Sequence, residues 1–216
     1  MEIKVLKDIL NVNDQIAEKN RELLDSKGIF AVNLMSSPGA GKTSLVLETI
    51  RRLKGKTSIG VIEGDISSSV DAETVGKEGV PVLQINTGGG CHLDANMLSN
   101  ALSNLPLSDI ELLLIENVGN LICPAGFALG EHKKVLVSST PEGDDKPFKY
   151  PSMFHKADAV LINKIDLIPY LNFSTESFTQ TVRGINEKVE IFPISCTSGQ
   201  GIQEWISWLL TQMSKR

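Results

Sequence analysis

The sequence predicts an α/β fold: a mostly parallel sheet of about seven strands, covered by helices on both faces, with a further helix at the N-terminus. Two observations support this prediction. From residue 29 onward, short apolar runs alternate with segments whose composition suits helices. Within each run the apolar residues are nearly continuous, which is typical of strands buried on both faces of a parallel sheet.

The N-terminal residues show a different pattern. Between residues 8 and 27 a polar segment carries apolar residues at helical spacing, and Gly28 follows as a helix-ending residue. We therefore expect an amphipathic helix over residues 1–28, packed as an appendage, and one domain over residues 29–216. The apolar residues of the predicted helix are Ile9, Leu10, Ile16, Leu23 and Leu24.

The predicted strands also locate the expected binding site. Ligands of open parallel sheets bind beyond the carboxyl ends of the strands. Each motif described below falls at or just after such an end, so the motifs are expected to meet at one edge of the sheet. The apolar runs occupy residues 29–35, 57–65, 80–86, 110–117, 134–140, 157–164 and 190–195.

The composition of the 216-residue chain is ordinary for a globular protein, with 41% hydrophobic and 22% charged residues. No apolar run reaches the ~20 residues of a membrane helix. The first residues lack the apolar core of a secretory signal, so we expect a cytoplasmic protein. The net charge is 21 − 26 = −5, and no Lys/Arg block indicates nucleic-acid binding. An odd number of cysteines, three, argues against a disulfide framework.

A phosphate-binding loop is predicted directly after the first apolar run, where a helical segment begins. Small residues let successive backbone N–H groups surround phosphates, and a helix N-terminus adds partial positive charge. We expect Lys42 to reach the β- and γ-phosphates and the Thr43 hydroxyl to bind Mg²⁺. The usual first glycine of this motif is Ser36 here. The residues expected to bind nucleotide are Ser37, Pro38, Gly39, Ala40, Gly41, Lys42, Thr43 and Ser44.

A guanine-binding motif, NKID at 163–166, ends the sixth run. The Asp166 carboxylate can accept from both the ring N–H and the exocyclic amine of guanine, whereas adenine would leave it unpaired. Asn163 can tie this loop to the phosphate-binding loop, and the stem of Lys164 can cover the base. Ser195 and Cys196 follow the last run, where a second base contact is expected, although Cys196 equally fits a small buried residue.

Two acidic residues at strand ends are candidates for magnesium and for catalysis. Asp65 closes the second run and is the preferred Mg²⁺ ligand. Glu116 closes the fourth run and can orient water or support the magnesium site. The Gly119 N–H can respond to the γ-phosphate. The predicted catalytic residues are Lys42, Asp65 and Glu116.

A second metal site is predicted from Cys91, His92 and Cys123. Cys91 and His92 follow three glycines after the third run, and Cys123 lies seven residues after Glu116. Thiolate and imidazole ligands suit Zn²⁺ or Ni²⁺. Three ligands do not complete a four-coordinate site, so solvent or a symmetric partner would supply the rest. The alternative is that both cysteines are structural.

Together, these motifs resemble those of the HypB-type GTPases, which incorporate nickel into hydrogenase. A Cys-His pair after glycines, with a further Cys shortly after NVGN, distinguishes this family from its nearest relatives. The resemblance covers nearly the whole chain from about residue 30. The segments that carry it are NLMSSPGAGKTSL, IEGD with DAE at 71–73, GGGCHLDA, ENVGNLICPA, STPEGDDKPFKYP and NKID.

The resemblance implies a SIMIBI-class G domain that binds GTP or GDP with Mg²⁺ and hydrolyses GTP slowly. It also implies a homodimer that depends on nucleotide or metal, with Ni²⁺ or Zn²⁺ bound by the Cys/His residues near the interface. Hydrolysis would gate nickel transfer to the hydrogenase large subunit, helped by a partner metallochaperone. Lys149 is expected near the nucleotide of the second chain, with Lys146 as the alternative. Some relatives carry N-terminal Cys-rich or His-rich segments; this chain has neither, so high-affinity nickel storage is not expected.

Other functions fit the motifs less well. In the urease nickel-delivery GTPases we expect Cys-Pro-His, whereas Cys123-Pro124 is followed here by Ala125. The GTPases that protect cobalamin-dependent mutases do not need three soft ligands. A metal-binding scaffold with a vestigial nucleotide site is disfavoured by the intact Lys42 and Asp166. The NKID motif disfavours a small-molecule kinase.

Overall fold

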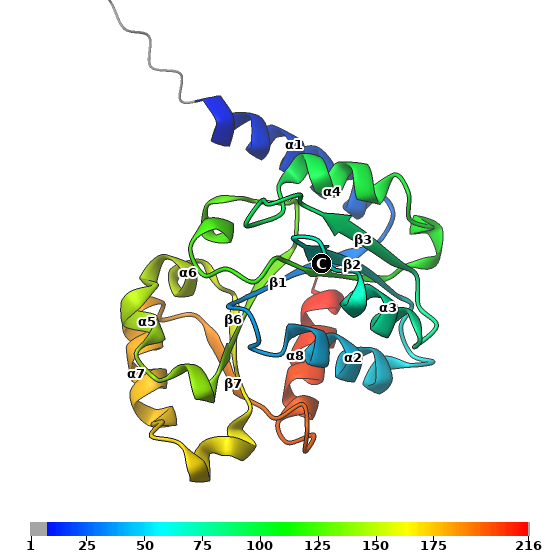
Figure 1. The fold of residues 1–216 in the computed structure, drawn as a ribbon. Coiled ribbons are helices and arrows are strands. Elements are labelled where there is room, and N and C mark those ends of the chain that lie inside the picture. The colour runs from blue at the N-terminus through cyan, green and yellow to red at the C-terminus, as the bar shows by residue number, and fades with distance from the viewer. Residues whose placement is uncertain (1–7, 216) are drawn as a thin grey trace, which may run out of the picture.

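A computed structural model describes residues 8–215 and confirms the predicted α/β architecture (Figure 1). The strands lie in the order β3-β2-β4-β1-β5-β6-β7, and all neighbouring strands are parallel. All seven carboxyl ends therefore lie at one edge of the sheet. The strands are β1 (Phe30–Ser36), β2 (Ile59–Asp65), β3 (Val82–Asn86), β4 (Leu112–Glu116), β5 (Lys133–Ser139), β6 (Ala159–Asn163) and β7 (Glu190–Pro193).

Helices cover both faces of this sheet, as Figure 1 shows, with α1 and α4 on one face and α2 and α8 on the other. The α-helices are α1 (Asp8–Ser26), α2 (Lys42–Leu53), α3 (Val70–Gly76), α4 (Ala95–Leu102), α5 (Lys146–Lys149), α6 (Pro151–Lys156), α7 (Thr175–Ile185) and α8 (Ile202–Ser214). Short 3₁₀ segments lie at Leu107–Asp109, Cys123–Gly126, Thr140–Glu142 and Ile165–Tyr170. Within residues 8–215, no helix combines the length and apolarity that crossing a membrane would require.

The alternating side chains of the central strand β1 separate the core into layers. Val32 and Leu34 belong to the apolar cluster that contains residues of α2 and α8. Ala31 and Met35 point to the opposite face and join the clusters of α1 with α4 and of α6 with α7, respectively. Because both faces are covered, β1 is buried along its whole length, as its apolar sequence predicted.

Helix α1 packs on α4 through a buried stripe in which the hydrophobic pattern predicted only Leu24. Residues 1–7 of the expected helical unit, and the side chains of Ile9 and Leu10, lie outside the part that the structure describes. The buried stripe consists of Asn13, Ala17, Asn20 and Leu24, so half of its members are amides. Gly28, with φ +73°, follows the helix end.

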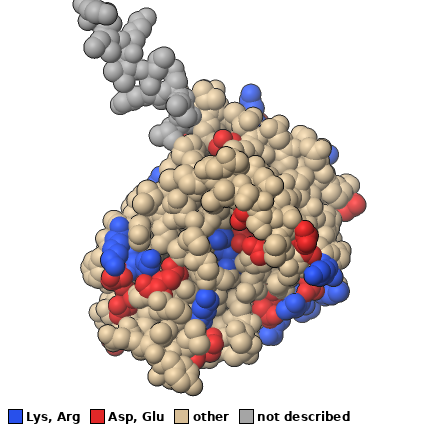
Figure 2. Space-filling model, in the orientation of Figure 1, with Lys and Arg blue, Asp and Glu red and all other residues tan. Residues whose placement is uncertain are grey.

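The surface charges are mixed in sign. On the face shown in Figure 2, basic and acidic side chains lie next to one another, and no broad basic patch is visible. This distribution agrees with the low overall charge and gives no support to a nucleic-acid surface on that face.

Gly130 permits the close contact between α1 and the loop before β5. Its φ is +104°, and an added Cβ would lie 2.6 Å from the Ala17 carbonyl oxygen and 2.7 Å from Asn20 Cβ. We expect Gly130→Ala to lower the free energy of unfolding by about 2 kcal/mol, because it adds backbone strain and separates α1 from the loop. Urea denaturation would measure this loss. Gly126→Ala is the matched control, since its Cβ would meet no atom within 4 Å; equal stability of the two variants would contradict the expectation.

Candidate functional site

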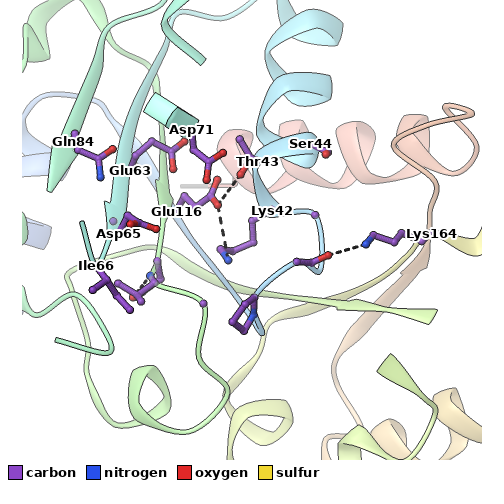
Figure 3. A pocket seen from close by; sticks show the side chains of 17 residues that line it. Lys42, Thr43, Ser44, Glu63, Asp65, Ile66, Asp71, Gln84, Glu116 and Lys164 are labelled. Carbon is purple, nitrogen blue, oxygen red and sulfur yellow. Dashed lines mark hydrogen bonds and ion pairs between the residues drawn. The ribbon is translucent and has the colours of Figure 1, made fainter. Parts of the chain in front are cut away.

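The loop between β1 and α2 forms one wall of a cavity of about 550 Å³ at the carboxyl edge of the sheet (Figure 3). Gly39 and Gly41 adopt positive φ values of 75° and 98°, which let the loop turn sharply into the helix. The buried Lys42 Nζ donates to Ser36 Oγ at 2.8 Å. The serine that replaces the usual glycine therefore holds the lysine beside the cavity.

Carboxylates converge on the cavity opposite this loop. Thr43 Oγ1 donates to Glu116 Oε1 at 3.0 Å, and Lys42 Nζ lies 3.8 Å from the same oxygen. Glu63 on β2 is paired in register with Glu116 on β4, so the two carboxyl groups are neighbours on one face of the sheet. Figure 3 shows Glu63, Asp71 and Glu116 pointing toward Thr43. The arrangement offers oxygen ligands to a hard cation.

Glu63 and Glu116 are both almost fully buried. Burial raises the pKa of both carboxyl groups, and the Glu116 carboxyl raises the pKa of Glu63 further. Within the described residues, no N–H or hydroxyl group donates to Glu63 Oε1 or Glu116 Oε2, and the two carboxyl groups are hydrogen-bonded to each other. Buried oxygens of this kind are normally satisfied, so the residues present fit a bound cation such as Mg²⁺ at this point.

Asp65, the expected magnesium ligand, lines the same cavity but is already engaged. Its Oδ1 accepts from the backbone N–H groups of Ser67 and Ser68 at 2.9 and 2.7 Å. These hydrogen bonds lower the pKa of the Asp65 carboxyl. Asp65 is thus the last residue of β2 and accepts hydrogen bonds from the turn that follows, while Glu116 contacts Thr43 directly.

The NKID loop contacts the phosphate-binding loop through side chains. Asn163 Nδ2 donates to the Ala40 carbonyl at 2.9 Å, and Lys164 Nζ donates to the Gly39 carbonyl at 2.7 Å. Lys164 adopts φ +63°, which turns the chain at the end of β6. Asp166 is half-buried and is not among the residues that line the cavity. Its Oδ1 is enclosed and has no hydrogen-bond partner in the part of the chain that the structure describes.

The second base segment lies beside this loop. The Cys196 N–H donates to Asn163 Oδ1 at 3.4 Å. Ser195 is fully buried, and its Oγ accepts from the Ser198 N–H at 3.0 Å. Burial raises the pKa of the Cys196 thiol to about 12, so this thiol stays protonated at neutral pH. Within the described residues, Cys196 is not part of a group of possible metal ligands, whereas the other two cysteines are.

Cys91, His92 and Cys123 come together as a cluster. One ligand atom from each lies within 4.8 Å of the others, and all three residues are half-buried. The Cys91 Sγ is 3.4 Å from His92 Nδ1, and Asn120 Nδ2 donates to Cys123 Sγ at 3.7 Å. Burial lowers the pKa of His92, which favours the neutral imidazole that metals bind. The His92 ring packs against Phe127 with 4.0 Å between ring centroids.

The cluster and the nucleotide cavity are joined by the turn after β4. The buried Asn117 Oδ1 accepts from the Leu93 N–H and from the Val118 N–H, both at 3.0 Å. Two residues farther on, a Cβ at Gly119 would lie 3.0 Å from Pro38 in the phosphate-binding loop. The segment that carries Cys91 and His92 is therefore connected to the segment that contacts the phosphate-binding loop.

Lys149 and Lys146 lie on α5. Lys149 forms an exposed ion pair with Asp145, and Lys146 Nζ lies 3.7 Å from Glu142 Oε1. Neither lysine lines the nucleotide cavity of its own chain.

Sequence reasoning missed Glu63, Asp71 and Gln84 as cavity residues. The signal for Glu63 was available, because Glu63 and Asp65 are two residues apart and side chains of a strand alternate between faces. Gln84 could be found only from the register that pairs it with Glu63. Asp71 reaches the cavity from α3, a helix whose position the apolar pattern of the sequence does not predict.

Known proteins are similar to this chain in sequence and in fold. Residues 30–193 match the family model described as CobW/HypB/UreG, nucleotide-binding domain. The hydrogenase maturation factor HypB of Escherichia coli K12 is 50% identical over 205 residues, covering 95% of this chain and 71% of that protein.

Two solved structures agree closely with this one. HypB from Archaeoglobus fulgidus has 41% identity and a TM-score of 0.89, covering 94% of this chain and 99% of that one. HypB from Helicobacter pylori in complex with nickel has 36% identity and a TM-score of 0.90, covering 94% and 96%, respectively. Matches of this extent in both sequence and structure show that the chain belongs to the HypB family of hydrogenase maturation factors.

Proposed function

We propose that this protein is a GTP-hydrolysing metallochaperone that gates nickel insertion during the maturation of [NiFe]-hydrogenase. The observation that carries the proposal is the position of the metal cluster. Cys91 and His92 lie on a loop that is hydrogen-bonded, through Asn117, to the turn that contacts the phosphate-binding loop. A change at the nucleotide can therefore reach the metal ligands over a short path of direct contacts.

The nucleotide-binding unit in this proposal comprises residues 29–216. The loop 37–44 surrounds the phosphates of GTP, and Lys42 balances their charge. Thr43 and Glu116 would hold Mg²⁺, with Glu63 and Asp65 beside them; when bound, this ion neutralises charge that develops on the phosphates. Hydrolysis yields GDP and phosphate, and slow turnover fits a site without a dedicated base.

Guanine selection is assigned to Asp166. Its unpartnered, buried Oδ1 supports this role, because a ligand with two N–H donors would satisfy the carboxylate. Asn163 and Lys164 hold the loop against the phosphate-binding loop. Ser195 and Cys196 support the loop from the other side.

The cargo in this proposal is Ni²⁺, with Zn²⁺ as a competing ion of similar ligand preference. The three cluster residues leave the coordination sphere incomplete. A second copy of the chain would complete it, so we propose a homodimer that depends on metal or nucleotide. In that dimer Lys149 would approach the nucleotide of the other copy. A partner metallochaperone and the hydrogenase large subunit would exchange the metal with this site.

Lys42 provides the first test of the nucleotide site. We expect Lys42→Ala to lower kcat/KM for GTP at least about 100-fold, because a buried cation at the phosphates is lost. Phosphate release assays would measure the change. Lys56→Ala, an exposed lysine beyond the end of α2, is the matched control and should hydrolyse GTP normally. Normal turnover in Lys42→Ala would refute the assignment.

Base selection depends on one carboxylate. We expect Asp166→Asn to reduce the preference for GTP over ATP at least about tenfold, since the acceptor for the two guanine donors is lost. Binding of xanthosine triphosphate should increase, because the new amide can donate to its 2-oxo group. Competition with a fluorescent guanine nucleotide would measure both changes. The exposed Asp109→Asn serves as control, and an unchanged nucleotide preference in Asp166→Asn would exclude the role.

The metal cluster is tested by removing both thiols. We expect the double variant Cys91→Ser, Cys123→Ser to lose stoichiometric Ni²⁺ and Zn²⁺ binding, while Cys196→Ser keeps it because that thiol is not part of the cluster. Calorimetry with GDP and with a non-hydrolysable GTP analogue would measure metal affinity, and light scattering would report the mass. If metal affinity and mass are independent of the nucleotide, the chain is a GTPase without the proposed gating.

A further inference from the structure

Helix α1 contacts the rest of the molecule through two buried asparagines, each of which makes two hydrogen bonds. Asn13 Oδ1 accepts from the Ala95 N–H at 2.9 Å, and Asn13 Nδ2 donates to the Ala128 carbonyl at 2.8 Å. Asn20 Nδ2 donates to the carbonyls of Ala95 and Leu129 at 2.8 and 2.9 Å. Both amides therefore join the same two segments of the chain.

These two segments are the ones that carry the metal ligands. Ala95 begins α4, three residues after His92, and its N–H is one of the donors that a helix start leaves without a partner. Ala128 directly follows Phe127, whose ring packs on His92. Cys123 begins the 3₁₀ segment that leads to Phe127. Asn13 thus connects the segment that contains Cys91 and His92 to the segment that contains Cys123.

We propose that Asn13 is a positioning residue for the Cys91–His92–Cys123 cluster and that α1 is part of the metal site. The inference rests on the proposed function, because it assumes that the cluster binds a divalent metal. By holding Ala95 and Ala128 with one rigid amide, Asn13 limits how far the two ligand-bearing segments can separate. The ligands are then held near one another before the metal arrives.

The chemistry of the Asn13 contact favours a role in positioning the ligand-bearing segments over a role in merely packing α1 onto the sheet. A helix that only needed to cover the sheet would bury apolar side chains, as α1 does with Ala17 and Leu24. Burying an amide is unfavourable unless its donor and acceptor are both satisfied. The Asn13 amide is satisfied on both sides, and its hydrogen bonds fix directions as well as distances.

The other end of the ligand loop is held by a different amide. Asn117 binds the Leu93 N–H, and Leu93 itself is fully buried against Gly64. His92 therefore lies between one segment fixed by Asn117 and another fixed by Asn13. Loss of the Asn13 amide weakens only the second attachment, to which Asn20 still contributes through the carbonyls of Ala95 and Leu129. The connection to the nucleotide cavity through Asn117 stays in place.

The test compares Ni²⁺ binding by the full chain and by two variants. We expect Asn13→Ala to weaken Ni²⁺ binding about tenfold, as is typical when a residue that orients metal ligands is lost. Arg21→Gln is the matched control, because Arg21 Nε also donates from α1 to this loop, at Gly130 O and 2.8 Å, but does not bond to the segment of Ala95. This variant should bind Ni²⁺ like the parent chain.

Thiolate-to-nickel charge-transfer absorption would report the ligand set, and binding of a fluorescent GDP analogue would show that each variant is folded. Asn13→Asp keeps the acceptor for Ala95 and loses the donor to Ala128, so it should also weaken metal binding. Unchanged Ni²⁺ affinity and absorption in Asn13→Ala would overturn the inference, as would an equal loss in Arg21→Gln. If the parent chain binds no Ni²⁺, the proposed function itself fails.

Discussion

The organisation of the site depends on the hydrogen bonds of the buried residue Asn117. It follows β4, and its backbone N–H donates to the Leu34 carbonyl of β1 at 2.9 Å. Its Nδ2 donates to Asn33 Oδ1 at 3.2 Å, while its Oδ1 receives two N–H groups. Asn117 therefore connects the central strand, the turn beside the phosphate-binding loop and the loop that carries Cys91 and His92. A displacement of any of the three changes the geometry available to the other two.

The buried charges of the cavity provide a second physical basis for the proposed coupling between nucleotide binding and metal binding. Glu63 and Glu116 are buried next to each other, which is unfavourable while both are charged and no cation lies between them. Lys42 offsets part of this charge, at 3.8 Å from Glu116. Binding of a phosphate with its cation would redistribute these charges close to Asn117. The linkage that the proposed function requires between nucleotide and metal would be reciprocal, so a nucleotide that weakens metal binding would itself bind more weakly when metal is present.

The sequence predicted the sheet well because burial on both faces leaves a clear apolar signature, and β2 and β6 lie within the expected runs. The phosphate-binding loop, the NKID motif and the Cys/His residues were recognisable because their chemistry restricts residue type. The burial of Asn13 and Asn20 could not be predicted, since hydrophobic periodicity treats an asparagine as exposed. Gln84 joined the cavity only through strand register, which depends on pairing between distant segments.

The unpaired oxygens of the cavity argue against a vestigial nucleotide site. A scaffold protein that had lost its ligand would gain stability by replacing buried charges with apolar side chains. This chain instead keeps Lys42, Glu63 and Glu116 almost completely buried, and among the described residues no N–H or hydroxyl group donates to Glu63 Oε1 or Glu116 Oε2. Asp166 Oδ1, in the NKID motif, likewise has no partner there. Such groups are costly to bury unless a ligand satisfies them. In the proposed function, binding of nucleotide and cation would recover the free energy lost in the empty state, which is the property that a nucleotide-controlled switch requires.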